Sequence, residues 1–226
     1  MTWALVFLVL ITGAQTGAAA EAVLTPDFNG LWQIGAEKKA LLPDTGASLL
    51  TTQARQQYAQ NQAALKAGKD SIDSMSRCLP PGVPRIMTLS RPFKLVQNAQ
   101  MLAFLFEWNH ISRWAYIGRD HFEPLGPSYL GQSVAKWEGD TLVIDSTNFN
   151  AATLLDSTGL PHGDALHVVE RLRLTAPNVL QSRVTIADPA TFIRPFEVVL
   201  TFKRLSGRLV ADDDWCIGAS GLIDTN

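Results

Sequence analysis

The chain has 226 residues, of which 46% are hydrophobic and 18% are charged, as expected for a single globular domain with a substantial core. Its 19 basic and 21 acidic residues give a formal charge of -2 and are spread along the sequence. No basic patch is therefore available to attract nucleic acid or an anionic membrane surface, and a function in nucleic acid binding is not supported.

The first twenty residues are typical of a signal peptide. An apolar run from Ala4 to Ile11 is followed by small residues ending in Ala18-Ala19-Ala20, which fits an A-x-A cleavage site before Glu21. No Lys or Arg precedes the apolar run, which departs from the usual pattern. An uncleaved anchor would need about 20 apolar residues, and this run is shorter. We predict a signal peptide over residues 1–20, a single domain over 21–226, no stable membrane span, and a periplasmic or secreted protein.

A short strand and a helix are the first elements expected after the signal peptide. Gly30 and Trp32 form a G-x-W run that resembles the opening of lipocalin-like barrels, where the tryptophan closes one end of the barrel. A buried tryptophan in any β domain would explain the run equally well. We expect Trp32 to be buried there, with Arg194 or Arg204 in a cation–π contact with its ring.

The segment from Thr51 to Lys66 predicts a helix that lies lightly on the surface. It is rich in Ala and Gln, has Thr51 or Thr52 as N-cap, and is followed by Gly68 as a stop signal. The next segment, residues 69–84, has too many prolines for a helix or a central strand and is expected to be a loop.

From Phe93 onward, apolar runs alternate with short turns, which predicts strand after strand. Strands are expected at residues 93–97, 101–107, 112–117, 133–137, 141–147, 166–174, 179–187, 196–205 and 209–211. About nine strands and one helix favour a mainly β fold, an antiparallel lipocalin-like β-barrel with one peripheral helix. Two longer loops, residues 120–132 and 148–165, are expected to form the mouth of the barrel and to carry function.

The stretch from Met101 to Asp120 has the densest aromatic run together with ionisable residues. Read with a period of two, one face is an aromatic wall that carries a histidine: Phe104, Phe106, Trp108, His110, Trp114 and Tyr116. The other face carries Glu107 and Arg113. Whether residues 108–111 bend or continue the strand stays open. The aromatic face is predicted to line a pocket for a small apolar or aromatic molecule, although tryptophans such as Trp108 and Trp114 are more often core residues than a ligand platform.

All four histidines lie between residues 110 and 167, on or beside the expected mouth. Imidazole exchanges protons near neutral pH without a cofactor, so a cofactor-free acid–base enzyme is the favoured function. The predicted catalytic residues are His110, His167, Glu107, Arg113 and Tyr116. The predicted ligand-binding residues are Phe104, Phe106, Trp108, Trp114, His121 and His162. The alternative is that all four histidines are structural or solvated.

Other chemistries find no motif in this chain. H-E-x-x-H and C-x-x-C pairs are absent from the sequence, so neither a metal nor another cofactor is predicted. The sequence also lacks G-x-S-x-G, phosphate-binding and G-x-G-x-x-G motifs, which argues against a serine hydrolase, an NTPase or a Rossmann enzyme.

Glu170 stands out in the strand over residues 166–174. It shares a face with the apolar Val168 and Leu172, so it should be buried and should need a cationic partner. Arg113 and Arg194 are the candidates. An ion pair that fixes the register of the barrel is favoured over a catalytic role.

The two cysteines, Cys78 and Cys216, would sit in an oxidising compartment after export and are predicted to form a disulfide. A nucleophilic thiol is the alternative. Three aspartates, residues 212–214, precede Cys216, and their negative charge would raise the pKa of its thiol and disfavour the reactive thiolate.

Three segments in this order resemble a family of exported bacterial proteins for which no activity is assigned: Cys78 to Pro84, Tyr129 to Asp145, and Leu166 to Arg171. The resemblance covers residues 27–216. It implies export and a shared fold, and it supplies no catalytic residue.

The sequence thus predicts an exported barrel that binds a small apolar or aromatic molecule. The favoured activity is that of a lyase, isomerase or cyclase without a cofactor. The alternative is a binding or carrier protein for a hydrophobic ligand, which would need the aromatic wall but no titratable pair. Nothing in the sequence indicates the substrate or the oligomeric state.

Overall fold

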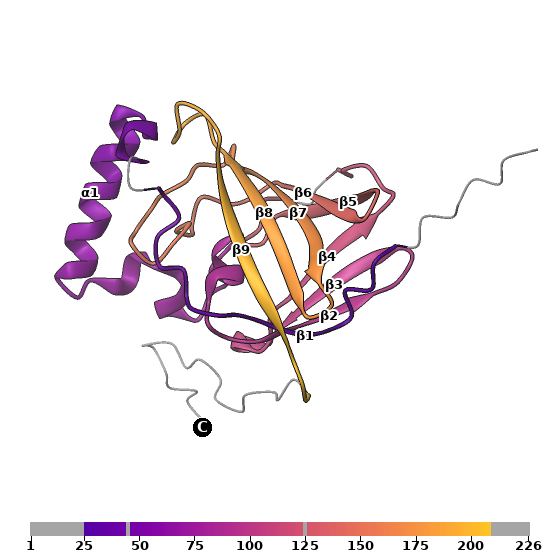
Figure 1. The fold of residues 1–226 in the computed structure, drawn as a ribbon. Coiled ribbons are helices and arrows are strands. Elements are labelled where there is room, and N and C mark those ends of the chain that lie inside the picture. The colour runs from indigo at the N-terminus through magenta and orange to yellow at the C-terminus, as the bar shows by residue number, and fades with distance from the viewer. Residues whose placement is uncertain (1–24, 44–45, 124–125, 209–226) are drawn as a thin grey trace, which may run out of the picture.

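The computed structural model describes residues 25–43, 46–123 and 126–208, and within this part of the chain nine strands close into a barrel in sequence order (Figure 1). The strands are β1 (Gly30–Ile34), β2 (Phe93–Gln97), β3 (Met101–Phe106), β4 (Ser112–Ile117), β5 (Gln132–Glu138), β6 (Thr141–Thr147), β7 (His167–Ala176), β8 (Val179–Ala187) and β9 (Phe196–Leu205). The mainly β, closed architecture is confirmed. The signal peptide, the strand expected at residues 209–211 and Cys216 lie outside the described residues, so the disulfide from Cys78 stays a prediction.

The prediction of a purely antiparallel barrel is wrong at one pair of strands. β4 and β5 run parallel, with Ala115 opposite Ser133 and Ile117 opposite Ala135, and every other neighbouring pair is antiparallel. Nine strands alternating in direction cannot close on themselves, because an odd number leaves one pair pointing the same way. A parallel pair needs a connection of about a dozen residues or more, and the segment over residues 118–131 provides it.

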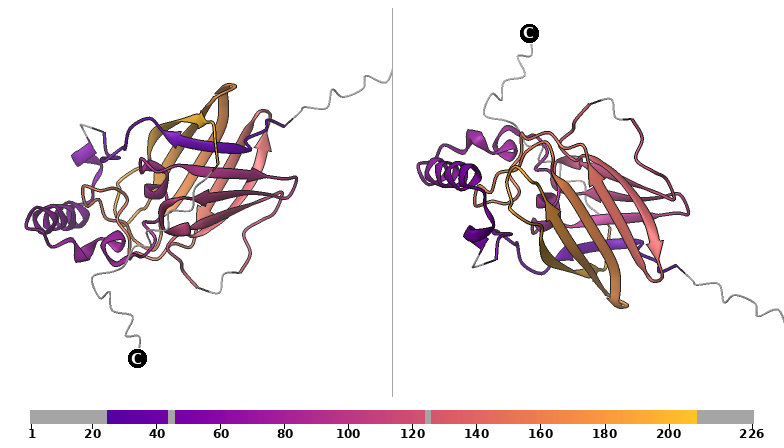
Figure 2. Two further views of the ribbon diagram at one scale, coloured as in Figure 1. Left: turned by 90° about the horizontal axis from the view of Figure 1, so that it is seen from below. Right: turned by 90° about the horizontal axis from the view of Figure 1, so that it is seen from above.

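The α-helix, α1 (Thr52–Lys66), lies on one side of the barrel in all views (Figure 2). Short 3₁₀ turns are η1 (Gly46–Leu49), η2 (Asp70–Ile72), η3 (Ser74–Arg77), η4 (Arg85–Thr88) and η5 (Trp108–His110). Thr51 caps α1, since its hydroxyl accepts a hydrogen bond from the Ala54 amide at 3.2 Å. The helix buries only Ala54 and Asn61, so the predicted light surface helix is confirmed. None of the helices in the described residues is long and apolar enough to cross a membrane.

Aromatic side chains fill the interior of the barrel. Phe93 contacts Phe202 edge-on with ring centroids 5.2 Å apart, and Phe104 and Phe106 stack at 6.2 Å. Trp32 is fully buried, and the Arg204 guanidinium lies over its ring at 4.2 Å, which confirms the expected cation–π contact.

The continuous aromatic face predicted for residues 101–120 is wrong. The turn η5 interrupts it, because Asn109 and His110 have positive φ angles of 50° and 53°. β4 then returns antiparallel with Arg113 opposite Phe104, and directly opposite residues point to the same side of a sheet. Arg113 is therefore inside the barrel, 2% exposed, whereas Trp114 points outward and is 44% exposed.

Candidate functional site

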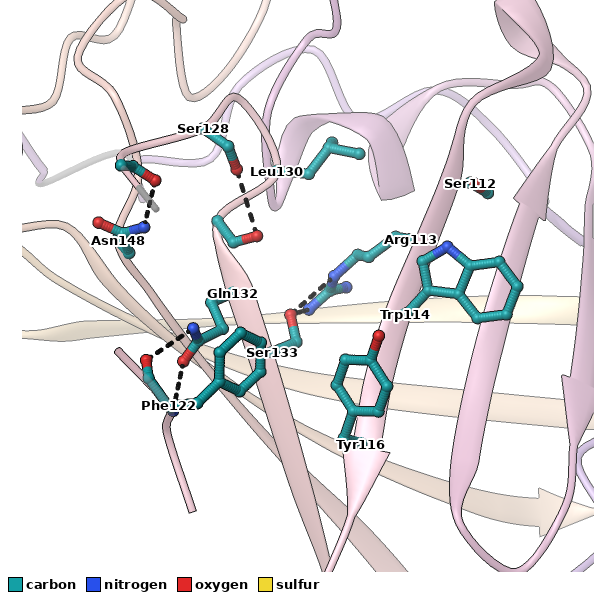
Figure 3. Close-up of a pocket in the computed structure, with 12 residues that line it drawn as sticks. Ser112, Arg113, Trp114, Tyr116, Phe122, Ser128, Leu130, Gln132, Ser133 and Asn148 are labelled. Carbon is teal, nitrogen blue, oxygen red and sulfur yellow. Dashed lines mark hydrogen bonds between the residues drawn. The ribbon is translucent and has the colours of Figure 1, made fainter. Parts of the chain in front are cut away.

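A pocket of about 380 Å³ lies where β4 and β5 separate (Figure 3). The two strands pair only from Ala115 to Ile117 on β4, and on the N-terminal side of this short ladder they diverge. The pocket is lined by Ser112, Arg113, Trp114, Tyr116, Phe122, Gly126, Ser128, Leu130, Gly131, Gln132, Ser133 and Asn148. Its wall combines aromatic and aliphatic side chains with polar ones, and small-molecule sites share this mixture.

Arg113 and Glu170 form a buried ion pair beside this pocket, with side chains 2% and 0% exposed. The Arg113 side chain crosses from β4 to Ser133 on β5 (Figure 3) and donates from Nε and Nη2 to the Ser133 hydroxyl at 3.3 and 3.2 Å. Nη2 also donates to the Ser146 hydroxyl at 2.9 Å and to Glu170. The expected pairing of Glu170 with Arg113 is confirmed, and it connects β4, β5, β6 and β7 from inside the barrel.

Three atoms of this interior remain without a hydrogen-bond partner among the described residues: Arg113 Nη1, Glu170 Oε1 and Ser182 Oγ. Buried polar groups in native proteins are nearly always paired with protein, water or ligand. All three atoms are buried, so they lie in the interior of the barrel rather than open to the pocket.

The segment between β4 and β5 forms one side of the pocket. The Gln132 side chain fixes it to the barrel, donating to the Phe122 carbonyl at 2.9 Å and accepting from the Phe122 amide at 3.2 Å. Gly131, with a φ of +67°, permits the turn into β5, because a Cβ there would lie 2.5 Å from the Thr147 carbonyl oxygen. The expectation that the loop over residues 120–132 contributes to a ligand mouth is consistent with this arrangement.

The structure brings His121 and His167 together at Asp145 and places His110 and His162 elsewhere, and none of the four lines this pocket. His110 is exposed in η5. His121 and His167 lie on the outer face of the barrel, where the Nε2 atom of each is 2.9 Å from Asp145 Oδ1. His162 is buried in the loop before β7, with its Nε2 2.7 Å from the Thr153 hydroxyl. Roles for these residues in catalysis or ligand binding stay predictions.

The other predicted site residues divide into two groups. Arg113, Trp114 and Tyr116 line the pocket, from neighbouring positions on β4. Phe104 and Phe106 pack in the core, Trp108 lies in η5, and Glu107 forms an ion pair of 3.5 Å with Arg91. Within the residues that the structure describes, no group of three or more His, Cys, Asp or Glu side chains is arranged to hold a metal ion.

Several residues of the site were not identified from the sequence, notably Phe122, Gln132, Ser133 and Ser146. The two serines carried a usable signal, because each alternates with apolar residues on a buried strand face, as Glu170 does. Three polar residues on inward faces of adjacent strands indicate a shared network. Phe122 and Gln132 carried no such pattern, since they meet only through the fold of the intervening loop.

Burial lowers the pKa of His162, against smaller opposing effects of the Gly163 carbonyl and of Asp188 and Asp164. The unfolded chain therefore binds more protons than the folded one, and stability should fall as the pH drops below the usual value near 6.5. When the pH is lowered from about 7.5 to 5, we expect the free energy of unfolding of His162→Gln to fall by less than that of the wild type. Urea denaturation at both pH values measures this difference, and equal losses in the two proteins would contradict it.

Comparisons with known proteins add little. A scan against protein-family models finds no match, and a search of curated proteins finds no relative. Among solved structures, crystal structures of two mutants of the fluorescent protein UnaG match with TM-scores of 0.38 and 0.35, at 12% and 13% identity. Each match covers 80% of this chain and 97% of the other. These TM-scores are too low for us to infer a fold relationship or a ligand, so the function is argued from the pocket itself.

Proposed function

We propose that the protein binds a small, largely apolar or aromatic molecule in the pocket between β4 and β5. The observation that supports it is a pocket of about 380 Å³ whose walls include the aromatic side chains of Trp114, Tyr116 and Phe122. Apolar walls provide affinity and one polar contact sets the orientation of the ligand. Phe122 is 52% exposed and Trp114 44%, so both present apolar area that a ligand would cover.

The proposal includes export to the periplasm or the exterior, which rests on the signal-peptide pattern of residues 1–20 and on the resemblance to exported proteins described above. It also includes the lipocalin-like character of the barrel, supported by the buried Trp32 with Arg204 over its ring.

An acid–base enzyme is the second candidate. Arg113 and Tyr116 favour it, because both line the pocket and both could stabilise negative charge developing on a substrate. The histidines expected to move the proton do not line the pocket, so binding without turnover has the better support. Product analysis after incubation with any compound that binds distinguishes the two, since product would favour the enzyme.

Two tryptophans test the location of the site. Trp114→Ala should weaken the binding of an aromatic ligand about tenfold or more, because it removes a large apolar wall. Trp108→Ala is the matched control, since Trp108 lies in η5 and does not line the pocket, and it should change affinity by less than about twofold. Isothermal titration with phenol, indole and naphthalene derivatives measures both. A larger loss from Trp108→Ala would place the ligand elsewhere.

A further inference from the structure

Two histidines on the outer face of the barrel share one carboxylate. His121 lies in the segment between β4 and β5, His167 begins β7, and the Nε2 atom of each lies 2.9 Å from Oδ1 of Asp145 on β6. The side chains of His121, His167 and Asp145 are 33%, 43% and 40% exposed. An ionised carboxylate only accepts hydrogen bonds, so each of the two Nε2 atoms must carry a proton to bind it.

The second ring nitrogen distinguishes His121 from His167. Nδ1 of His121 lies 2.9 Å from Oε1 of Gln132. The orientation of that amide is fixed, because Gln132 Nε2 donates to the Phe122 carbonyl at 2.9 Å and Oε1 accepts from the Phe122 amide at 3.2 Å. Both nitrogens of His121 therefore meet acceptors, and only the imidazolium, with a proton on each, makes both hydrogen bonds. His167 needs a proton on Nε2 alone, which its neutral form provides.

The other groups around His121 do not alter this requirement. The Thr147 hydroxyl, 3.4 Å from Nδ1, can donate or accept and lies farther away than the Gln132 oxygen. The surface hollow that His121 shares with Asp145 is also lined by five charged residues: Arg119, Asp120, Lys136, Glu138 and Arg171. Glu138 is paired with Lys136 and Arg171, and the Arg119 guanidinium lies over the Tyr116 ring. Cations and carboxylates are thus mixed in this hollow, and the two direct contacts decide which form of His121 fits.

These contacts reach the pocket through Phe122, the residue that follows His121. Its backbone is held by the same Gln132 side chain that accepts from His121. Its ring lies edge-on to Tyr116, with centroids 6.0 Å apart, and both rings line the pocket (Figure 3). A change at His121 is therefore two contacts away from the aromatic wall.

We infer that ligand binding in the pocket between β4 and β5 is coupled to protonation of His121. The imidazolium holds Phe122 in place at the wall, and loss of its proton leaves a lone pair facing either Gln132 or Asp145, which weakens the wall. The arrangement is complete at acidic pH and is lost as the pH rises through the range in which histidine changes charge, about pH 5 to 8. This inference rests on the proposed function and concerns its regulation.

Ligand affinity at two pH values provides the first test. Indole and 2-naphthalenemethanol are uncharged at about pH 5.5 and at about pH 8, so only the protein changes its charge between them. In isothermal titration with wild-type protein, a probe that binds should bind about threefold to tenfold more tightly at the lower pH. Equal affinity at both pH values would overturn the inference and leave the proposed function intact.

Two histidine variants locate the titrating group. His121→Gln should bind the probe with the same affinity at both pH values, because glutamine carries no titrating proton. His167→Gln is the matched control, since it removes the other histidine at Asp145 and should keep the wild-type dependence on pH. A dependence that persists in His121→Gln, or one that disappears in His167→Gln alone, contradicts the assignment to His121.

Solvent exchange of the Phe122 amide, measured by NMR, needs no ligand. This amide donates to Gln132, so its protection factor reports whether the wall is held. The protection factor of the wild type should be about threefold or more higher at about pH 5.5 than at about pH 8, and that of His121→Gln should not change. An unchanged protection factor in the wild type overturns the inference. If no probe binds, the proposed function is overturned, and the protection factor alone decides whether the proton on His121 holds Phe122.

Discussion

Arg113→Met is expected to lower the free energy of unfolding by about 3–5 kcal/mol, because it leaves the carboxylate of Glu170 buried without a cation. Glu170→Leu should cost a similar amount for the converse reason. The double variant should recover most of the loss, since two apolar side chains of similar size leave no buried charge. Urea denaturation of the four proteins gives the coupling energy directly.

A surface pair serves as the control for this cycle. Arg183 and Glu197 are each about half exposed, so Arg183→Met should change stability by less than about 1 kcal/mol. If the stability losses of Arg113→Met and Glu170→Leu simply add up in the double variant, the two side chains do not stabilise each other, which would contradict the buried ion pair.

Phe106→Ala is expected to lower the free energy of unfolding by about 3–5 kcal/mol, because the ring packs in the barrel core and its removal leaves a cavity. Phe106 is 4% exposed and contacts Phe93 and Phe104, with no part in the pocket wall. The milder Phe106→Leu should therefore keep the ligand affinity of the wild type. Thermal or urea unfolding measures the first effect and isothermal titration the second.

The sequence had suggested the opposite role for this residue, a wall of the ligand cavity. A large loss of affinity in folded Phe106→Leu, with little loss of stability, would restore that role and contradict the structure's division between core and pocket.

Elements whose limits depend on local chemistry could be predicted from the sequence. Strands such as residues 93–97, 112–117 and 179–187 match the structure residue for residue, because alternating apolar side chains and turn residues act within a few positions. The cap of α1 at Thr51 is equally local. The need of Glu170 for a cation could also be inferred, since a buried carboxylate requires one, but the sequence left Arg113 and Arg194 as candidates and the structure selected Arg113.

The tertiary structure alone decided where the pocket lies. Positive φ angles at Asn109 and His110 break the period-two pattern, so the residues after the turn change faces, and Arg113 enters the barrel while Trp114 leaves it. Closure of nine strands forces one parallel pair, and register places that pair at β4 and β5, where the ladder is short and the pocket opens beside it. The histidines were placed in the same way: His121 and His167 meet at Asp145, whereas His162 is buried against Thr153. Faces and registers of separate strands, rather than spacing along the chain, set which side chains meet.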